Sequence, residues 1–136
     1  LEINTMRPAI AAAHGKVLSY GLGLGYIAYM AALKPEVVSV TVVELNDTII
    51  ELFKKYILPQ FGIAGKKLSI IHADAFMYAE TEMGEGSFDF VFTDLWHDVS
   101  DGTDMYFRIK EYEKNSPEAE FSYWIEQSIL CHLRGF

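Results

Sequence analysis

The sequence has little cysteine: Cys131 is the single thiol in 136 residues. One thiol excludes an internal disulfide framework and a cysteine-based zinc site. Four prolines and ten glycines are too few for a linker-rich or disordered chain. No apolar run reaches about 18 residues, and the first residues lack the basic and apolar regions of a signal peptide. What remains is a globular chain with one core, for which we predict a cytoplasmic location and no membrane contact.

Basic residues are also scarce. The chain carries 19 acidic and 11 basic residues, which gives a net charge of -8. The imbalance is local, because residues 1–70 contain 5 acids and 7 bases whereas residues 71–120 contain 13 acids and 3 bases. An acidic surface repels polyanions. We therefore expect no nucleic-acid partner. A small-molecule substrate is the expected partner; the acidic half could attract a cationic one, and a merely solubilising surface is the alternative.

Four apolar segments predict β-strands at about 16–20, 37–44, 67–72 and 88–94. Helical patterns separate them, and apolar strands alternating with helices are typical of a parallel sheet covered on both faces. Right-handed crossovers then favour an α/β fold with a doubly wound, mostly parallel sheet in the order 3-2-1-4. Ligands of such sheets bind at the carboxyl ends of the strands.

The last third of the chain predicts helices at about 104–114 and 117–133, with no fifth strand. A full domain of this kind has more strands, so the sequence analysis predicts a partial domain, 1–136, that is truncated before strand five. Strand four would then lie at a sheet edge with unpaired backbone groups. We expect a helix or a homo-oligomer contact to cover that edge.

Three alternate glycines, Gly21, Gly23 and Gly25, directly follow the first predicted strand and open a helix. Glycine has no Cβ, so the backbone can turn sharply and approach a ligand closely. The free N–H groups of a helix start favour the polar atoms of a nucleotide. The alternative is a tight turn without a ligand.

Glu44 ends the second predicted strand, 21 residues after Gly23. This is about the spacing at which an acidic residue accepts hydrogen bonds from the ribose hydroxyls of a bound nucleoside. A solvated acid at a strand end is the alternative. The glycines and the acid together are more specific than either alone.

The motif series resembles that of class I S-adenosylmethionine enzymes, and most closely the spermidine synthases and their methyltransferase relatives. The segments that carry the resemblance are Tyr20-Gly-Leu-Gly-Leu-Gly25, Val42-Val-Glu-Leu-Asn46, His72-Ala-Asp-Ala75 and Phe90-Val-Phe-Thr-Asp94. The resemblance covers roughly residues 15–98. It implies a Rossmann-like fold, S-adenosyl-L-methionine as cofactor and a transferase activity.

The resemblance also implies roles for single residues. The three glycines would wrap the methionine and ribose parts of the cofactor, and Glu44 would bind the ribose. Asp74 and Ala75 would lie near the adenine, although an aspartate after a strand also commonly caps the next helix. Asp94 would lie at the catalytic mouth, where a carboxylate can deprotonate an amine or hydroxyl nucleophile. His97 is a second catalytic candidate, and a structural histidine is its alternative.

Two segments depart from the family pattern. Many methyltransferases have an acid two residues before the first glycine, where this chain has Ser19. Spermidine synthases have an Asp-Ser-x-Asp-Pro run after the fourth strand, where this chain reads Asp94-Leu-Trp-His-Asp98. Methyl transfer is therefore the first interpretation and aminopropyl transfer the second.

Two further classes stay open. Gly23-Leu-Gly-Tyr-Ile-Ala28 matches the dinucleotide pattern of NAD-dependent oxidoreductases, although Gly21, Asp74 and the Asp94 segment fit the first family better. A non-catalytic domain that keeps the fold is the other class. The remaining histidines show no metal-ligand spacing, so no metal site is predicted.

Overall fold

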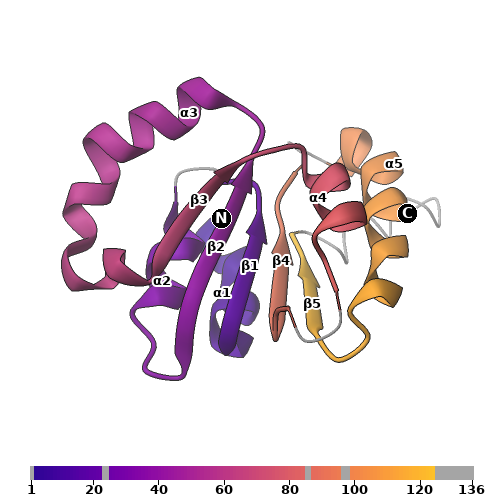
Figure 1. Cartoon of the computed structure of the whole chain (residues 1–136), viewed down its shortest axis with the longest axis horizontal. Helices are drawn as coiled ribbons and strands as arrows, with labels where there is room; N and C mark the ends of the chain where they lie inside the picture. Colours follow the sequence, from indigo (N-terminus) through magenta and orange to yellow (C-terminus); the bar gives the residue numbers. More distant parts are fainter. Residues whose placement is uncertain (1, 23–24, 85–86, 96–98, 125–136) are drawn as a thin grey trace.

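The computed structural model of the protein describes residues 2–22, 25–84, 87–95 and 99–124. The strands pair in parallel in the order β3-β2-β1-β4-β5 (Figure 1). Their bounds are β1 Gly15–Tyr20, β2 Val37–Glu44, β3 Leu68–His72, β4 Phe90–Thr93 and β5 Glu120–Tyr123. The predicted order of the first four strands and the α/β class are confirmed.

Helices cover both faces of the sheet, with α1 and α2 behind it in Figure 1 and α4 and α5 beside β4 and β5. After β2, a short α-helix continues as a π-helical turn and then as 3-10 turns before β3. Among the described residues, no helix is both long and apolar enough to cross a membrane. The bounds are α1 Glu2–Ala12, α2 Tyr26–Ala32, α3 Asp47–Leu52, η1 Phe53–Ile57, η2 Leu58–Lys67, α4 Ala75–Thr81, α5 Val99–Lys110 and η3 Glu111–Asn115.

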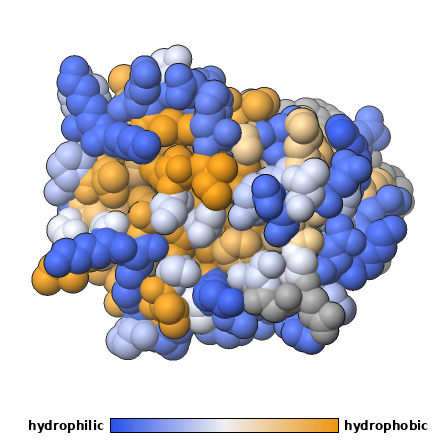
Figure 2. Space-filling view, viewed as in Figure 1, coloured by the Kyte–Doolittle hydropathy of each residue, from blue (hydrophilic) through white to orange (hydrophobic). Residues whose placement is uncertain are grey.

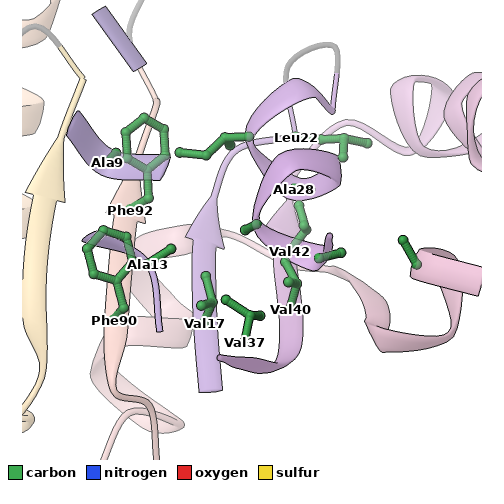
Figure 3. Packing of buried hydrophobic residues seen from close by; sticks show 14 of the residues in the cluster. Ala9, Ala13, Val17, Leu22, Ala28, Val37, Val40, Val42, Phe90 and Phe92 are labelled. Atoms are coloured by element: carbon green, nitrogen blue, oxygen red, sulfur yellow. The ribbon is translucent and has the colours of Figure 1, made fainter. Parts of the chain in front are cut away.

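One hydrophobic core lies between the sheet and helices α1 and α2. Val17, Val40 and Val42 contribute alternate side chains from β1 and β2, and Phe90 and Phe92 do the same from β4 (Figure 3). Side chains two residues apart in a strand point to the same face, which explains this pattern. Small residues of α1 and α2 face these strands, so the helices pack closely against the sheet.

A second core lies on the opposite face, under α4 and α5. Leu18, Val43 and Val91 point to this side, and Ala79 and Tyr106 cover them from the helices. All five side chains are buried. Figure 2 shows the outside of this region: hydrophilic residues dominate the side where α5 lies, as the acidic composition of residues 71–120 leads one to expect.

The predicted truncation before strand five is wrong, because residues 120–123 form β5 and pair in parallel with β4. The sequence predicts a helix over 117–133, but residues 120–123 alternate between polar and aromatic side chains, which suits a strand. The edge of β4 is therefore paired within the chain. This edge therefore needs no oligomer contact to pair its backbone groups.

Lys34 links the end of α1 to the rest of the domain by hydrogen bonds. Its Nζ donates hydrogen bonds to the backbone carbonyls of Ile10, Ala11 and Ala13, at 2.9, 2.9 and 2.7 Å. The last carbonyl groups of a helix have no partner within the helix, and a cation is favoured at that end. The lysine thus caps α1 from the loop that follows α2.

Candidate functional site

The carboxyl ends of the strands surround a pocket of about 800 Å³. It lies across β1 and β4, where the strand order changes direction and doubly wound sheets bind their ligands. Five of the predicted site residues line it, together with eight others that come from β2, α3, α4, α5 and the turns after β2, β4 and β5. The lining residues are Gly21, Val43, Glu44, Leu45, Asn46, Ile49, Asp74, Ala75, Phe76, Asp94, Leu95, Met105 and Trp124.

Gly21 forms the turn after β1 and has a φ of +94°, a region that L side chains rarely adopt. Its N–H donates to the carbonyl oxygen of Val43 at 2.8 Å. A methyl group at Gly21 would overlap the backbone carbonyl oxygen of Asp94. The need for glycine here is therefore explained by the close approach of β4. Contact with a cofactor stays a prediction.

Gly25 is the N-cap of α2 and has a φ of +81°. A methyl group there would overlap the ring of Phe53, which belongs to η1 and is buried. Gly25 does not line the pocket, so the structure separates it from Gly21. Gly23 lies outside the described residues.

The Glu44 carboxylate accepts hydrogen bonds from two backbone N–H groups of the site. One carboxylate oxygen accepts the N–H of Leu22 at 2.8 Å, and the other accepts the N–H of Asn46 at 3.0 Å. These bonds hold the carboxylate between the turn after β1 and the turn after β2. A carboxylate has about four acceptor positions, so each oxygen of Glu44 keeps capacity for a ligand hydroxyl.

Asp74 caps α4, as the alternative interpretation predicted. Its Oδ1 accepts the N–H groups of Phe76 and Met77 at 2.8 and 3.3 Å. Both bonds fall on one oxygen, which leaves Oδ2 able to accept a donor from a ligand. Ala75 follows as the first residue of α4 and is buried beside it. The cap and the predicted contact with adenine are thus compatible.

Asp94 directly follows β4 and lines the pocket. Its N–H donates to the carbonyl oxygen of Tyr20 at 2.9 Å, which continues the β1–β4 ladder past the end of the strand. The backbone therefore fixes Asp94 next to Gly21. Because β1 lies between β2 and β4, Asp94 and Glu44 follow the two strands that flank β1. His97, the second catalytic candidate, lies outside the described residues.

Burial keeps the residues beneath the glycine turn uncharged. Ser19, at the position where many methyltransferases have an acid, is buried, and its Oγ donates to the carbonyl oxygen of Gly21 at 3.1 Å. Burial, with Tyr78 nearby, raises the pKa of the Tyr20 hydroxyl far above its usual range. Tyr20 is therefore a neutral phenol at physiological pH. Neither side chain can act there as a base.

Apolar side chains that the sequence did not single out form the walls of the pocket. Ile49 is 37% exposed and lines the pocket from α3. Phe76 and Met105 come from α4 and α5, and the Arg108 guanidinium lies 4.0 Å from the centre of the Phe76 ring. Phe76 directly follows two predicted residues and could have been found by adjacency. Met105 carries no signal in the sequence.

These residues suit an adenosyl group. Glu44 and Asp74 offer carboxylate acceptors for hydroxyl and amino donors, whereas Ile49, Phe76 and Met105 offer apolar surface for a ring. Pockets of this kind, mostly apolar with a few oriented polar groups, bind small molecules and cofactors. Within the described ranges, no group of three or more His, Cys, Asp or Glu side chains could hold a metal ion.

Sequence comparison extends this picture beyond the residues of the pocket. The family model of the spermine/spermidine synthase domain matches residues 9–116, which include all the described residues that line the pocket except Trp124. No curated protein sequence matches the chain.

Solved structures share the fold at low identity. Spermidine synthase from Thermotoga maritima is similar over 82% of this chain and 37% of its own, with 19% identity and a TM-score of 0.60. A putative methylase from Haemophilus influenzae is similar over 84% and 61%, with 20% identity and a TM-score of 0.60. A putative O-methyltransferase from Klebsiella pneumoniae is similar over 83% and 49%, with 15% identity and a TM-score of 0.57. The chain thus spans between about a third and two thirds of these proteins.

Proposed function

The chain belongs to the spermine/spermidine synthase domain family, and from this premise we propose that its pocket binds S-adenosylmethionine and serves group transfer to a small acceptor. The observation that carries the proposal is the Glu44 carboxylate, held at the pocket by the N–H groups of Leu22 and Asn46. A fixed acceptor pair at the end of the second strand is what nucleoside recognition in such sheets requires. Methyl transfer is the first candidate reaction.

The protein's own residues would bind and orient the two reactants. The bound sulfonium supplies an activated carbon centre, so little covalent chemistry is left to the protein. Glu44 would accept hydrogen bonds from the ribose hydroxyls, and Asp74 Oδ2 would accept one from the adenine amino group. Ile49 and Phe76 would exclude water from the adenine ring. Holding reactants in line is the main source of rate in such a site.

Asp94 would deprotonate the acceptor. It lies at the pocket beside the turn after β1, where its backbone is fixed by β1. The described lining contains three carboxylates and neither lysine nor arginine, so its field favours a cationic acceptor such as an amine. A protonated amine must lose a proton before its nitrogen can attack carbon, and a carboxylate within reach can accept that proton.

Aminopropyl transfer is the second candidate, and the match to the spermine/spermidine synthase domain favours it. Both reactions need the same adenosine contacts and a deprotonated nucleophile. They differ in the sulfonium: methyl transfer uses S-adenosylmethionine, whereas aminopropyl transfer uses its decarboxylated form. Ligand preference therefore separates the two candidates.

Thermal stability tests the proposal directly. A ligand that binds only the folded chain stabilises it by RT ln(1 + [L]/Kd), about 2.7 kcal/mol at a hundredfold excess over Kd. We expect S-adenosylmethionine or S-adenosylhomocysteine to raise the Tm, and a larger rise with decarboxylated S-adenosylmethionine would favour aminopropyl transfer. A rise with NAD and none with the adenosyl compounds would overturn the proposal.

Glu44→Gln gives the residue-level prediction. The variant loses the charge and one of the two acceptor oxygens, so we expect a loss of about 1–3 kcal/mol in affinity for S-adenosylhomocysteine, measured by calorimetry. Glu51→Gln in α3, an exposed acid outside the pocket, is the matched control and should bind like the parent. Equal affinities for both variants would show that Glu44 does not contact the ligand.

A further inference from the structure

The peptide unit between Leu45 and Asn46 is held at both of its ends. Its N–H, which belongs to Asn46, donates to Glu44 at 3.0 Å. Its carbonyl oxygen, which belongs to Leu45, lies 2.9 Å from Nε2 of His72. The peptide bond is planar, so these two groups point in opposite directions and move together. The orientation of this one unit therefore decides whether Glu44 keeps its second hydrogen bond.

His72 is the last residue of β3 and lies beside Glu44 in the parallel register of β2 and β3. Because a carbonyl oxygen can only accept, Nε2 must carry the proton of this hydrogen bond. The other ring nitrogen, Nδ1, lies 3.9 Å from a carboxylate oxygen of Asp47. The side chain is 55% exposed, so its contribution to the hydrophobic cores is small.

We propose that His72 is a positioning residue for Glu44 and acts through the Leu45–Asn46 peptide. The inference rests on the proposed function, in which Glu44 binds the ribose of the cofactor. A donor on the carbonyl polarises the peptide and strengthens the N–H bond at its other end, because hydrogen bonds in a chain reinforce one another. His72 thereby fixes both the direction and the strength of the bond that holds the Glu44 carboxylate.

The neighbouring hydrogen bonds do not orient the Leu45–Asn46 peptide, so its carbonyl depends on His72. The carbonyl of Glu44 accepts the N–H of Ala73 at 3.1 Å, which fixes the chain before the peptide. The side chain of Asn46 accepts the N–H of Ile49 at 3.2 Å, which fixes the chain after it. Neither bond involves the peptide unit itself. A rotation of that unit would break its bonds to Glu44 and His72 together and turn the pocket-lining Leu45–Asn46 segment.

A double-mutant cycle distinguishes positioning from a general structural role. We expect His72→Ala to weaken S-adenosylhomocysteine binding roughly three- to tenfold, which corresponds to one hydrogen bond. His72→Gln can place an amide donor near the position of Nε2 and should recover most of the affinity. In a Glu44→Ala background, His72→Ala should cost less than about twofold, because the carboxylate that it positions is gone. Full additivity of the two losses, or no rescue by glutamine, would overturn the inference.

A measurement without ligand separates this inference from the proposed function. In the parent, NMR should show a proton on Nε2 of His72 and slow hydrogen exchange of the Asn46 amide. His72→Ala should speed that exchange at least about threefold and leave the Ala73 amide unchanged. An unchanged Asn46 amide would overturn the inference even if the cofactor binds. Absence of adenosyl binding with an accelerated Asn46 amide would overturn the proposed function alone.

Discussion

Both ends of β1 combine a glycine with an aspartate next to β4, but the two contacts differ. Each end carries a glycine with positive φ, Gly15 at +63° and Gly21 at +94°, and each glycine lies against an aspartate that flanks β4. At the amino end the contact is the side chain of Asp89, whose carboxylate also accepts the N–H of Lys16 at 2.8 Å. At the carboxyl end the contact is the backbone carbonyl of Asp94.

The difference lies in how each aspartate meets β1: Asp89 through its carboxylate and Asp94 through its main chain. Asp89 uses its carboxylate to satisfy a strand end, as a backbone partner would. Asp94 meets β1 through its backbone N–H, and the residue lines the pocket. An aspartate at the carboxyl end of a strand and at the pocket is therefore the better catalytic candidate of the two.

The largest expected effect concerns the two glycines. Gly21→Ala combines a positive φ with overlap against backbone that cannot move alone, so we expect it to lower the free energy of unfolding by at least about 3 kcal/mol. Gly15→Ala meets the Asp89 side chain, which can rotate away, so we expect a loss of about 1–2 kcal/mol. Urea denaturation measures both.

The pair Gly15→Ala and Asp89→Ala tests the explanation. Part of the cost at Gly15 should disappear when Asp89 is already shortened, because the overlapping atoms are gone. A Gly21→Ala variant as stable as Gly15→Ala would show that the carboxyl end of β1 is as adaptable as the amino end.

The second expected effect concerns the two aspartates. Asp89→Ala removes the acceptor of the Lys16 N–H and should cost about 1–2 kcal/mol of stability while sparing S-adenosylhomocysteine affinity in the folded protein. Asp94→Asn should lower transfer about 100-fold and nearly spare that affinity, because loss of a general base affects the chemical step. Transfer of a labelled methyl group to a panel of small amines and alcohols provides the rate. Equal losses of rate and affinity would assign Asp94 to ligand binding.

The smallest effect is a pH dependence at the carboxyl end of β1. Burial raises the pKa of Tyr20 in the folded state above the value of about 10 expected for the unfolded chain. Its contribution to stability is therefore complete below about pH 10 and declines as the pH rises, because the unfolded chain then releases the proton more readily. Tyr20→Phe should show a weaker alkaline decline in urea midpoint, and the exposed Tyr56→Phe should follow the parent. Parallel curves for Tyr20→Phe and the parent would contradict this.

The first three strands were predictable because each is a local pattern. Val37–Glu44 is a β-branched run bounded by a Lys-Pro turn and a helix cap, and the structure gives the same bounds. Glu44, Asp74 and Asp94 could be placed at one sheet edge because parallel strands bring their carboxyl ends together. Their placement at one edge followed from residue type and position, whereas their roles toward a cofactor were expected from the family resemblance.

β5 and the pocket walls could not be predicted, because contacts between distant parts of the chain decide both. Phe121 and Trp124 are three residues apart, which also suits a helix face, and four residues are too few for either period to dominate. Pairing with β4, about 30 residues earlier in the chain, decides the outcome. Met105 reaches the pocket because α5 packs beside α4, a contact that no local pattern encodes.

Because Lys34 caps α1, its chemical reactivity reports whether the helix is in place. An ammonium that donates to three carbonyls and is 19% exposed is protected from amine-reactive labels, which attack the neutral, accessible form. Exposed lysines such as Lys54 and Lys55 lack that shield. The labelling rate of Lys34, relative to theirs, therefore reports how often α1 detaches from the sheet.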